Sequence, residues 1–216
     1  MRTESALRKE IVSTCLQMEQ MGINQGSSGN VSIRWKDGML ITPSGLPYEA
    51  TSPEDIIFVE FSDNSAQGLQ KPSSEWLFHR DILASRTDID AVIHTHSVYA
   101  TAMAIQRMDI PAHHYMVAAA GGNKIQCARY ATFGTRALSD NALSALGGRL
   151  ACLLANHGVI ALGPDLPRAL WLANEIETLA KQFFIASQYG QPIVLPDEEM
   201  ARVIERFKSY GPKKTD

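Results

Sequence analysis

The sequence predicts an α/β domain with a mixed, largely antiparallel central sheet flanked by helices. Two observations support this prediction. Short apolar or alternating runs, typical of strands, are interspersed with longer segments of helical periodicity. Two pairs of these runs are separated by tight turns, which join antiparallel neighbours. The 216 residues suit one domain better than two. We therefore expect residues 1–216 to form a single domain with a loosely held tail from about residue 207.

The N-terminal part of the chain predicts a helix followed by a hairpin. Apolar residues recur at helical spacing from residue 5 to residue 21, and Gly22 is a plausible stop. The alternating run 31–35 then indicates a strand, and the turn Lys36-Asp37-Gly38 joins it to an apolar return strand in a hairpin. The expected elements are a helix over 5–21, a polar loop over 24–30, strands over 31–35, 39–42 and 56–61, and a surface connection over 63–71.

The remainder of the chain alternates helices with apolar strands. Pro72 opens a predicted helix that runs to about Ser85, and Asp165 caps a long helix with Pro167 in its first turn. Residues 109–134 are rich in glycine and alanine and predict no clear element. The other expected elements are strands over 91–96, 150–155 and 159–162, and helices from about residue 97 and over 136–146.

Composition excludes several classes of partner. The net charge is −3, from 20 basic and 23 acidic residues, so nothing favours nucleic acid or an anionic membrane. No apolar stretch is long enough to span a membrane. The three cysteines, Cys15, Cys127 and Cys152, lie far apart without a CxxC motif. This spacing favours free thiols in a reducing cytoplasm.

The pair His94 and His96 is the clearest candidate for metal binding. Both follow the apolar run 91–93, and residues i and i+2 of a strand point to the same side. His157 lies between two strands, beside Gly158, and is the best third ligand. Three histidines with one open position are typical of a catalytic zinc. On spacing alone, His157 is equally compatible with an ordinary turn residue, because isolated HxH pairs occur by chance.

Three short segments rich in small polar residues are candidates for phosphate binding. They are Ser28-Gly29-Asn30, Thr42-Pro43-Ser44-Gly45 and Ser73-Ser74. The last lies at a predicted helix start, where free N–H groups favour an anion. Each alone is also compatible with a turn or an N-cap. Glu75 follows the two serines, and it becomes a candidate for proton transfer only if that helix start faces the metal.

Taken together, these motifs resemble the class II aldolase/adducin family. The matching segments are Gly29-Asn30-Val31-Ser32, Leu40-Ile41-Thr42-Pro43-Ser44-Gly45, Lys71-Pro72-Ser73-Ser74-Glu75, His94-Thr95-His96 and Asn156-His157-Gly158. The resemblance extends through residues 114–122, 130–135 and 207–211, and it covers nearly the whole chain.

The resemblance implies a zinc-dependent aldolase. Its substrate would be a ketose 1-phosphate of the L-fuculose 1-phosphate type, cleaved to dihydroxyacetone phosphate and an aldehyde. The implied zinc ligands are His94, His96 and His157, with Glu75 as both the exchangeable fourth ligand and the catalytic acid/base.

The resemblance also assigns the remaining site residues. Those on the family's phosphate-binding positions are Gly29, Asn30, Ser44, Gly45, Ser73 and Ser74. Tyr115 would protonate the aldehyde oxygen in the neighbouring subunit's site, and Phe133 and Tyr210 would line the aldehyde end. The implied assembly is a homotetramer with active sites between subunits.

Several alternatives stay open on the sequence. An aldolase for 5-deoxyribulose 1-phosphate or 5-methylthioribulose 1-phosphate would keep every residue named above. A methylthioribulose-1-phosphate dehydratase and a non-catalytic adducin-like interaction module are more distant. Pentulose-5-phosphate 4-epimerases rank lower because they have an aspartate where this chain has Glu75. A cupin, which also uses an HxH pair, is disfavoured by the long helix from Asp165.

Overall fold

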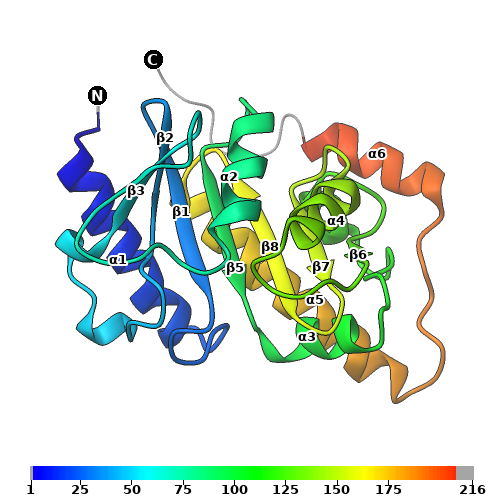
Figure 1. The fold of residues 1–216 in the computed structure, drawn as a ribbon. Helices are drawn as coiled ribbons and strands as arrows, with labels where there is room; N and C mark the ends of the chain where they lie inside the picture. Colours follow the sequence, from blue (N-terminus) through cyan, green and yellow to red (C-terminus); the bar gives the residue numbers. More distant parts are fainter. Residues whose placement is uncertain (1, 208–216) are drawn as a thin grey trace.

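The central element of the fold is one eight-stranded sheet. The computed structural model describes residues 2–207, and the strands follow the spatial order β4-β3-β2-β1-β5-β8-β7-β6 (Figure 1). Their bounds are Asn30–Trp35 (β1), Gly38–Ile41 (β2), Ile57–Glu60 (β3), Ala66–Gln67 (β4), Ala91–Thr95 (β5), Gln126–Ala128 (β6), Ala151–Leu154 (β7) and Gly158–Gly163 (β8).

The pairing of these strands confirms the predicted mixed, largely antiparallel sheet. Only β6 and β7 are parallel, and every other neighbouring pair is antiparallel. β5 lies in the middle, between β1 and β8. Its residue His94 pairs with Asn30 on one side and with Ile160 on the other. Segments far apart in the sequence therefore meet at the C-terminal end of β5.

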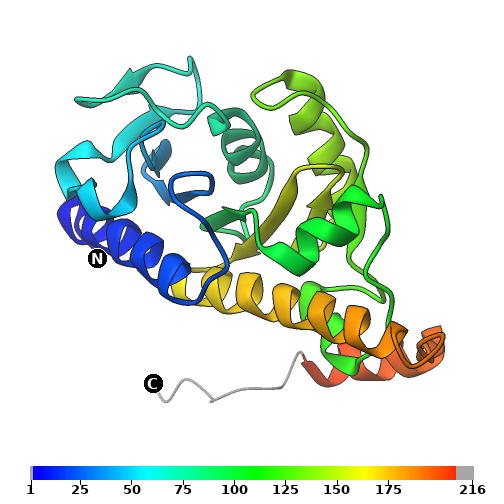
Figure 2. The ribbon, with the colours of Figure 1, turned by 90° about the horizontal axis from the view of Figure 1, so that it is seen from below.

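Helices cover both faces of the sheet. They are α1 (Glu4–Gln20), α2 (Trp76–Ser85), α3 (Val98–Ile105), α4 (Arg136–Leu146), α5 (Leu166–Ser187) and α6 (Asp197–Phe207). In Figure 2, α1 and α5 lie along one face, and α2 and α4 lie over the other. Alternation along β5 divides the core accordingly: Ile93 packs in the α1 and α5 layer, and Val92 packs in the α2 and α4 layer.

Most predicted helices form near the expected bounds. The helix α4 spans the predicted residues and ends at Gly147, which is in the left-handed region. The cap of α5 is the Asp165 side chain, which accepts a hydrogen bond from the Arg168 N–H at 2.8 Å. In the described part of the chain, no helix is long and apolar enough to cross a membrane.

Two predictions about helices are wrong. The helix α2 begins at Trp76 instead of Pro72, because residues 71–73 continue the sheet-like pairing of the loop after β2. The Ser73 N–H donates to the Thr42 carbonyl, and Pro43 bridges Pro72. The sequence analysis also predicts no helix for the residues of α6, although α6 buries Met200 in the main core. The predicted tail lies outside the described residues, except for Phe207 at the end of α6.

Candidate metal centre

Three histidine rings converge at the C-terminal end of β5. His94 is the fourth residue of that strand and is fully buried, and His96 follows two residues later on the same face. The third ring comes from His157 in the turn between β7 and β8, and β8 pairs directly with β5. The three ring centroids lie 4.8–5.0 Å apart, and the ring planes are nearly perpendicular to one another.

Two glycines allow the backbone to pack this closely. A Cβ atom on Gly158 would lie 2.4 Å from the Thr95 carbonyl oxygen and 2.9 Å from Cδ2 of His96. On the opposite side of β5, a Cβ atom on Gly29 would lie 2.5 Å from the His94 carbonyl oxygen. Both distances are far below ordinary contact, so only glycine fits at either position.

Glu75 completes the cluster from the other layer. It is the N-cap of α2, its side chain makes no capping bond, and it is 5% exposed. The expected place in the first helical turn is therefore wrong, because the helix starts one residue later. The carboxylate instead lies 3.2 Å (Oε2) from His94 Nε2 and 3.0 Å (Oε1) from His157 Nε2. Glu75 therefore faces the histidines, which is the condition under which the sequence makes it a candidate for proton transfer.

The four side chains present a donor set that fits a divalent metal. One ligand atom from each residue lies within 4.8 Å of the others, and the His94 and His96 Nε2 atoms are 3.0 Å apart. Ligands about 2.0–2.1 Å from a tetrahedral zinc are about 3.3 Å from one another. The observed separations of 3.0–3.2 Å are close to that value.

A backbone carbonyl fixes the direction in which His94 binds. Its Nδ1 lies 2.9 Å from the Val159 carbonyl oxygen. A carbonyl can only accept, so Nδ1 carries a proton, and Nε2 is the ring atom that faces the centre of the cluster and would offer its lone pair to a metal. This orientation is typical of a histidine that binds a metal.

Electrostatic interactions within the cluster shift the pKa values of Glu75 and His96. Burial would raise the pKa of the Glu75 carboxyl, but the charge of His94 and the hydrogen bonds of His157 and His94 outweigh burial and hold that pKa well below its ordinary value. Burial lowers the pKa of His96 to about 4, and the charges of His94 and His157 act in the same direction. At neutral pH the cluster therefore contains a carboxylate and a neutral His96 ring.

Behind Glu75, a buried line of polar side chains runs from α2 to β1. The Asn30 amide donates to Glu75 Oε2 at 3.0 Å, and His79 Nε2 lies 2.5 Å from Asn30 Oδ1. On its other side, His79 Nδ1 lies 2.7 Å from Ser32 Oγ. Complete burial lowers the pKa of His79 to about 3, so this ring is neutral at pH 7. His79 does not contact Glu75 directly, although the two residues are one helical turn apart.

A cavity of about 410 Å³ opens next to the cluster. The predicted site residues that line it are Ser44, Gly45, Ser74, Glu75, His96, Phe133 and His157. The other lining residues are Ser27, Ser28, Tyr130, Ala131 and Asn156. Hydroxyl groups thus line the same cavity as His96 and His157, a combination that suits a small ligand with an anionic group.

Three residues predicted to bind phosphate also contact other parts of the protein around Glu75. Asn30 and Ser73 are each 4% exposed. The Asn30 amide bonds to Glu75 and His79, and the Ser73 hydroxyl accepts a hydrogen bond from the Glu75 N–H at 3.3 Å. Gly29 packs against the backbone of His94. These residues shape the wall around Glu75.

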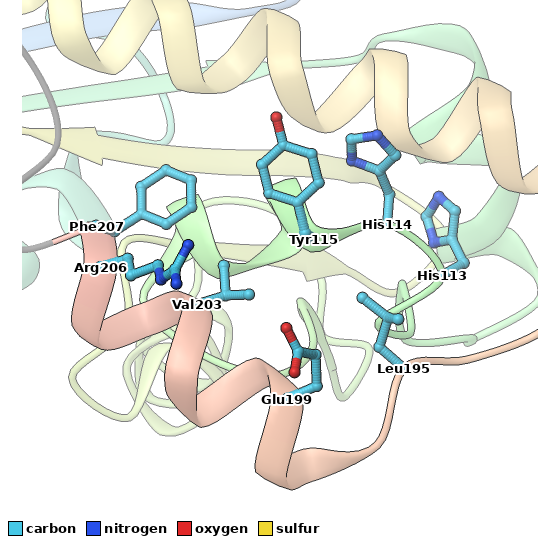
Figure 3. Close-up of a pocket in the computed structure, with 8 residues that line it drawn as sticks. All are labelled: His113, His114, Tyr115, Leu195, Glu199, Val203, Arg206 and Phe207. Carbon is cyan, nitrogen blue, oxygen red and sulfur yellow. The ribbon is translucent and has the colours of Figure 1, made fainter.

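Tyr115 lies apart from the histidine cluster of its own chain. It begins a 3-10 helix, Tyr115–Ala120, is 52% exposed, and its ring stacks on His114 with centroids 4.7 Å apart. Figure 3 shows it in a second cavity, between the 3-10 helix and α6. The other residues that line this cavity are His113, His114, Leu195, Glu199, Val203, Arg206 and Phe207. Tyr210 lies outside the described residues.

Sequence reasoning does not find two parts of this arrangement. Tyr130 lines the cavity from the segment 109–134, for which periodicity predicts no element. The Ser32–His79 contact requires α2 to lie next to β1, and β2, β3 and β4 separate these two elements in the chain. The local sequence gives no signal for Ser32, because it stands at a polar position of the alternating strand 31–35.

The chain is similar to known proteins along nearly its whole length. The family model described as the class II aldolase and adducin N-terminal domain matches residues 9–184. The L-fuculose phosphate aldolase of Escherichia coli (strain K12) is 50% identical over 206 residues, which is 95% of each chain. The 5-methylthioribulose-1-phosphate/5-deoxyribulose-1-phosphate aldolase of Rhodospirillum rubrum is 51% identical over 206 residues, 95% of this chain and 93% of that protein. Among solved structures, an L-fuculose 1-phosphate aldolase superposes with a TM-score of 0.92 at 40% identity and covers 96% of this chain and 98% of its own.

Proposed function

This chain belongs to the class II aldolase and adducin family, and from this we infer that it is a lyase that cleaves a ketose 1-phosphate to dihydroxyacetone phosphate and an aldehyde. The observation that carries the inference is the group formed by Glu75, His94, His96 and His157, in the wall of a cavity that also contains serine hydroxyls. A non-catalytic module of the same family would have no need for this intact donor set.

We assign zinc to this donor set, with one ion per subunit. Three imidazoles and one carboxylate are ligands that zinc accepts, and the carboxylate is the one that substrate oxygens can replace. When bound, the ion supplies Lewis-acid stabilisation of the negative charge that develops beside the carbonyl as the carbon–carbon bond breaks.

The part of the cavity lined by Ser44, Gly45 and Ser74 is the proposed phosphate site. Serine hydroxyls and backbone N–H groups donate to phosphate oxygens. Gly29, Asn30 and Ser73 are proposed to bind phosphate together with these lining residues: Asn30 and Ser73 hydrogen bond to Glu75, and Gly29 packs against the backbone of His94. Binding of the phosphate, which does not react, fixes the position of the carbons that do.

Two residues are proposed to move protons. Glu75 has an ionised carboxylate next to the cluster, and after release from the metal it would exchange the proton on the dihydroxyacetone phosphate fragment. Tyr115 would exchange the proton on the aldehyde oxygen. Phe133, which is 64% exposed and lines the cavity, would contact the aldehyde end together with Tyr210.

Assembly into a homotetramer with sites between subunits is part of this proposal. Its support is the position of Tyr115, which is exposed and lines a different cavity from Glu75. We propose that a phenol placed in this way acts at the metal site of another subunit. The three free thiols favour a reducing compartment such as the cytoplasm.

Two substrate types have almost equal support from the relatives, at 50% and 51% identity. The deciding experiment compares kcat/KM for L-fuculose, 5-deoxyribulose and 5-methylthioribulose 1-phosphates by the release of dihydroxyacetone phosphate. The unphosphorylated ketoses are the matched controls, and they should react about 100-fold less efficiently or worse, because they lack the remote binding energy. If the zinc-loaded protein releases dihydroxyacetone phosphate from none of the three, the proposed function is wrong.

A mixing experiment tests the site between subunits. Glu75→Gln and Tyr115→Phe variants should each have low activity, and exchange of their subunits should restore activity. The restored sites would combine Glu75 of one subunit with Tyr115 of another. No recovery after verified subunit exchange would show that each site is built within one chain.

A further inference from the structure

Four polar groups form a continuous hydrogen-bonded line that ends on the Glu75 carboxylate. Its members are Ser32 on β1, His79 on α2, Asn30 at the start of β1, and Glu75. The three contacts measure 2.7, 2.5 and 3.0 Å. Ser32 and His79 are fully buried, and Asn30 is 4% exposed. No water competes for these bonds, so each group must find its partner within the line.

The charge of Glu75 fixes the direction of every bond in this line. An ionised carboxylate only accepts, so Asn30 must turn its NH₂ group toward Glu75 and its carbonyl oxygen toward His79. His79 Nε2 must then carry the proton. Its Nδ1 is left as an acceptor, and the Ser32 hydroxyl donates to it. Only one tautomer of His79 and one orientation of the Asn30 amide satisfy all three contacts.

The opposite arrangement would act against catalysis. With the proton on Nδ1, His79 Nε2 would accept instead of donate, and the Asn30 amide would turn by half a rotation to meet it. Asn30 would then present its carbonyl oxygen to Glu75 Oε2 at about hydrogen-bond distance. Two acceptors at that separation repel each other, and in a buried site the carboxylate would have to move.

Packing holds the His79 ring in place for this task. The ring stacks on Phe78 with centroids 4.6 Å apart and planes 22° apart. Phe78 in turn meets the His94 ring edge at 5.5 Å. Close packing of neighbouring side chains therefore restricts rotation of the His79 ring away from Asn30.

We propose that His79 is a positioning residue, which holds the Asn30 amide in the one orientation that donates to Glu75 and thereby sets the position of Glu75 beside the metal site. His79 touches neither substrate nor metal in this proposal. Its kinetic consequence rests on the proposed aldolase function, whereas its consequence for metal binding does not.

Two variants that differ by one methylene group separate this role from a general structural one. His79→Gln places an amide near the Nε2 position and can still donate to Asn30. His79→Asn places the same amide near the Nδ1 position, where it reaches Ser32 but not Asn30. Thermal melting of both variants establishes that each is folded. His79→Phe fills the space of the ring without any donor, and it replaces the asparagine variant if that variant does not fold.

Two readouts are compared, the kinetics of ketose 1-phosphate cleavage and the affinity of the metal-free protein for Co²⁺. We expect His79→Asn to lose about 10- to 100-fold in kcat and in Co²⁺ affinity, the range typical for residues that orient metal ligands. His79→Gln should recover most of that loss in both kcat and Co²⁺ affinity.

Equal losses in the glutamine and asparagine variants would overturn the proposal, and so would wild-type kcat and Co²⁺ affinity in His79→Asn. Failure of the proposed function has a different signature. In that case the wild-type protein cleaves no ketose 1-phosphate, while the order of Co²⁺ affinities among the variants still tests the role of His79.

Discussion

Addition of one methyl group at Gly158 should disable the metal centre from the backbone side. In Gly158→Ala the new Cβ would lie 2.4 Å from the Thr95 carbonyl oxygen, whereas ordinary contact begins at 3.4 Å. The strands β5 and β8 must therefore separate by about 1 Å at this point. Overpacking of this kind costs about 1–3 kcal/mol of folding free energy. For a chain of this size, that cost lowers the melting temperature by about 2–12 °C.

The larger effect should fall on the metal site. Metal–ligand distances tolerate deviations of only about 0.2 Å. His94 and His96 are held by β5 and His157 by β8, so separation of the two strands moves the ligands apart. A misplacement of about 1 Å typically costs about 100-fold in rate. We therefore expect Gly158→Ala to bind Co²⁺ at least tenfold more weakly and to lose about 100-fold in kcat.

Gly163→Ala is the matched control, since Gly163 lies at the other end of β8. Its Cβ would lie 2.6 Å from the Ala169 backbone nitrogen and 2.9 Å from the Asp165 carbonyl oxygen, far from the histidines. Melting curves and Co²⁺ titrations of both variants are compared with wild type. Both variants should have a lower melting temperature than wild type, and only Gly158→Ala should bind Co²⁺ more weakly. If Gly158→Ala binds Co²⁺ as tightly as Gly163→Ala, close backbone packing does not set the ligand geometry.

Three further outcomes follow from the structure. Removal of the metal with a chelator should abolish cleavage and added zinc should restore it; turnover by verified metal-free protein would contradict the assigned centre. Glu75→Gln keeps the shape of the side chain without its charge, so it should lose at least about 100-fold in kcat while inorganic phosphate still competes with substrate, and unchanged turnover would remove its role as base. The free energy of unfolding should fall as the pH drops from 6.5 to about 3, because the unfolded chain binds a proton at His79 that the folded chain excludes. Urea titrations across this range should show a shallower pH slope for His79→Gln than for wild type, and parallel slopes would refute the assignment.

Local sequence patterns were sufficient for the parts of the fold that depend on near neighbours. The helix over 136–146 and the hairpin around Lys36-Asp37-Gly38 depend on periodicity and turn residues alone. The missed helix α6 carries a comparable signal, since three acidic residues follow Pro196 and apolar residues then recur at Met200, Val203 and Phe207. The acidic start and the spacing of these apolar residues are typical of a helix.

The arrangement of the site depends on contacts that no local pattern determines. The expectation that α2 starts at Pro72 failed because residues 71–73 bond to the loop after β2, a tertiary contact that overrides the preference of proline for a helix start. The contact of Asn30 with Glu75 requires both the β1–β5 register and the late start of α2. Sequence motifs could therefore propose the ligand set, but not the buried line behind it.

The close approach of the backbone on both sides of β5 has a thermodynamic consequence. In a zinc finger, metal binding and folding are one event, because the metal-free chain has no structure to receive the ion. Here the strand that carries His94 is held by two sheet neighbours, with Gly29 and Gly158 packed against its carbonyl groups. The imidazole directions are thus set before any ion arrives, and binding costs little conformational entropy. The binding free energy would not be needed to order the chain, so a metal could bind and dissociate, and the proposed exchange of Glu75 could take place, without unfolding of the sheet.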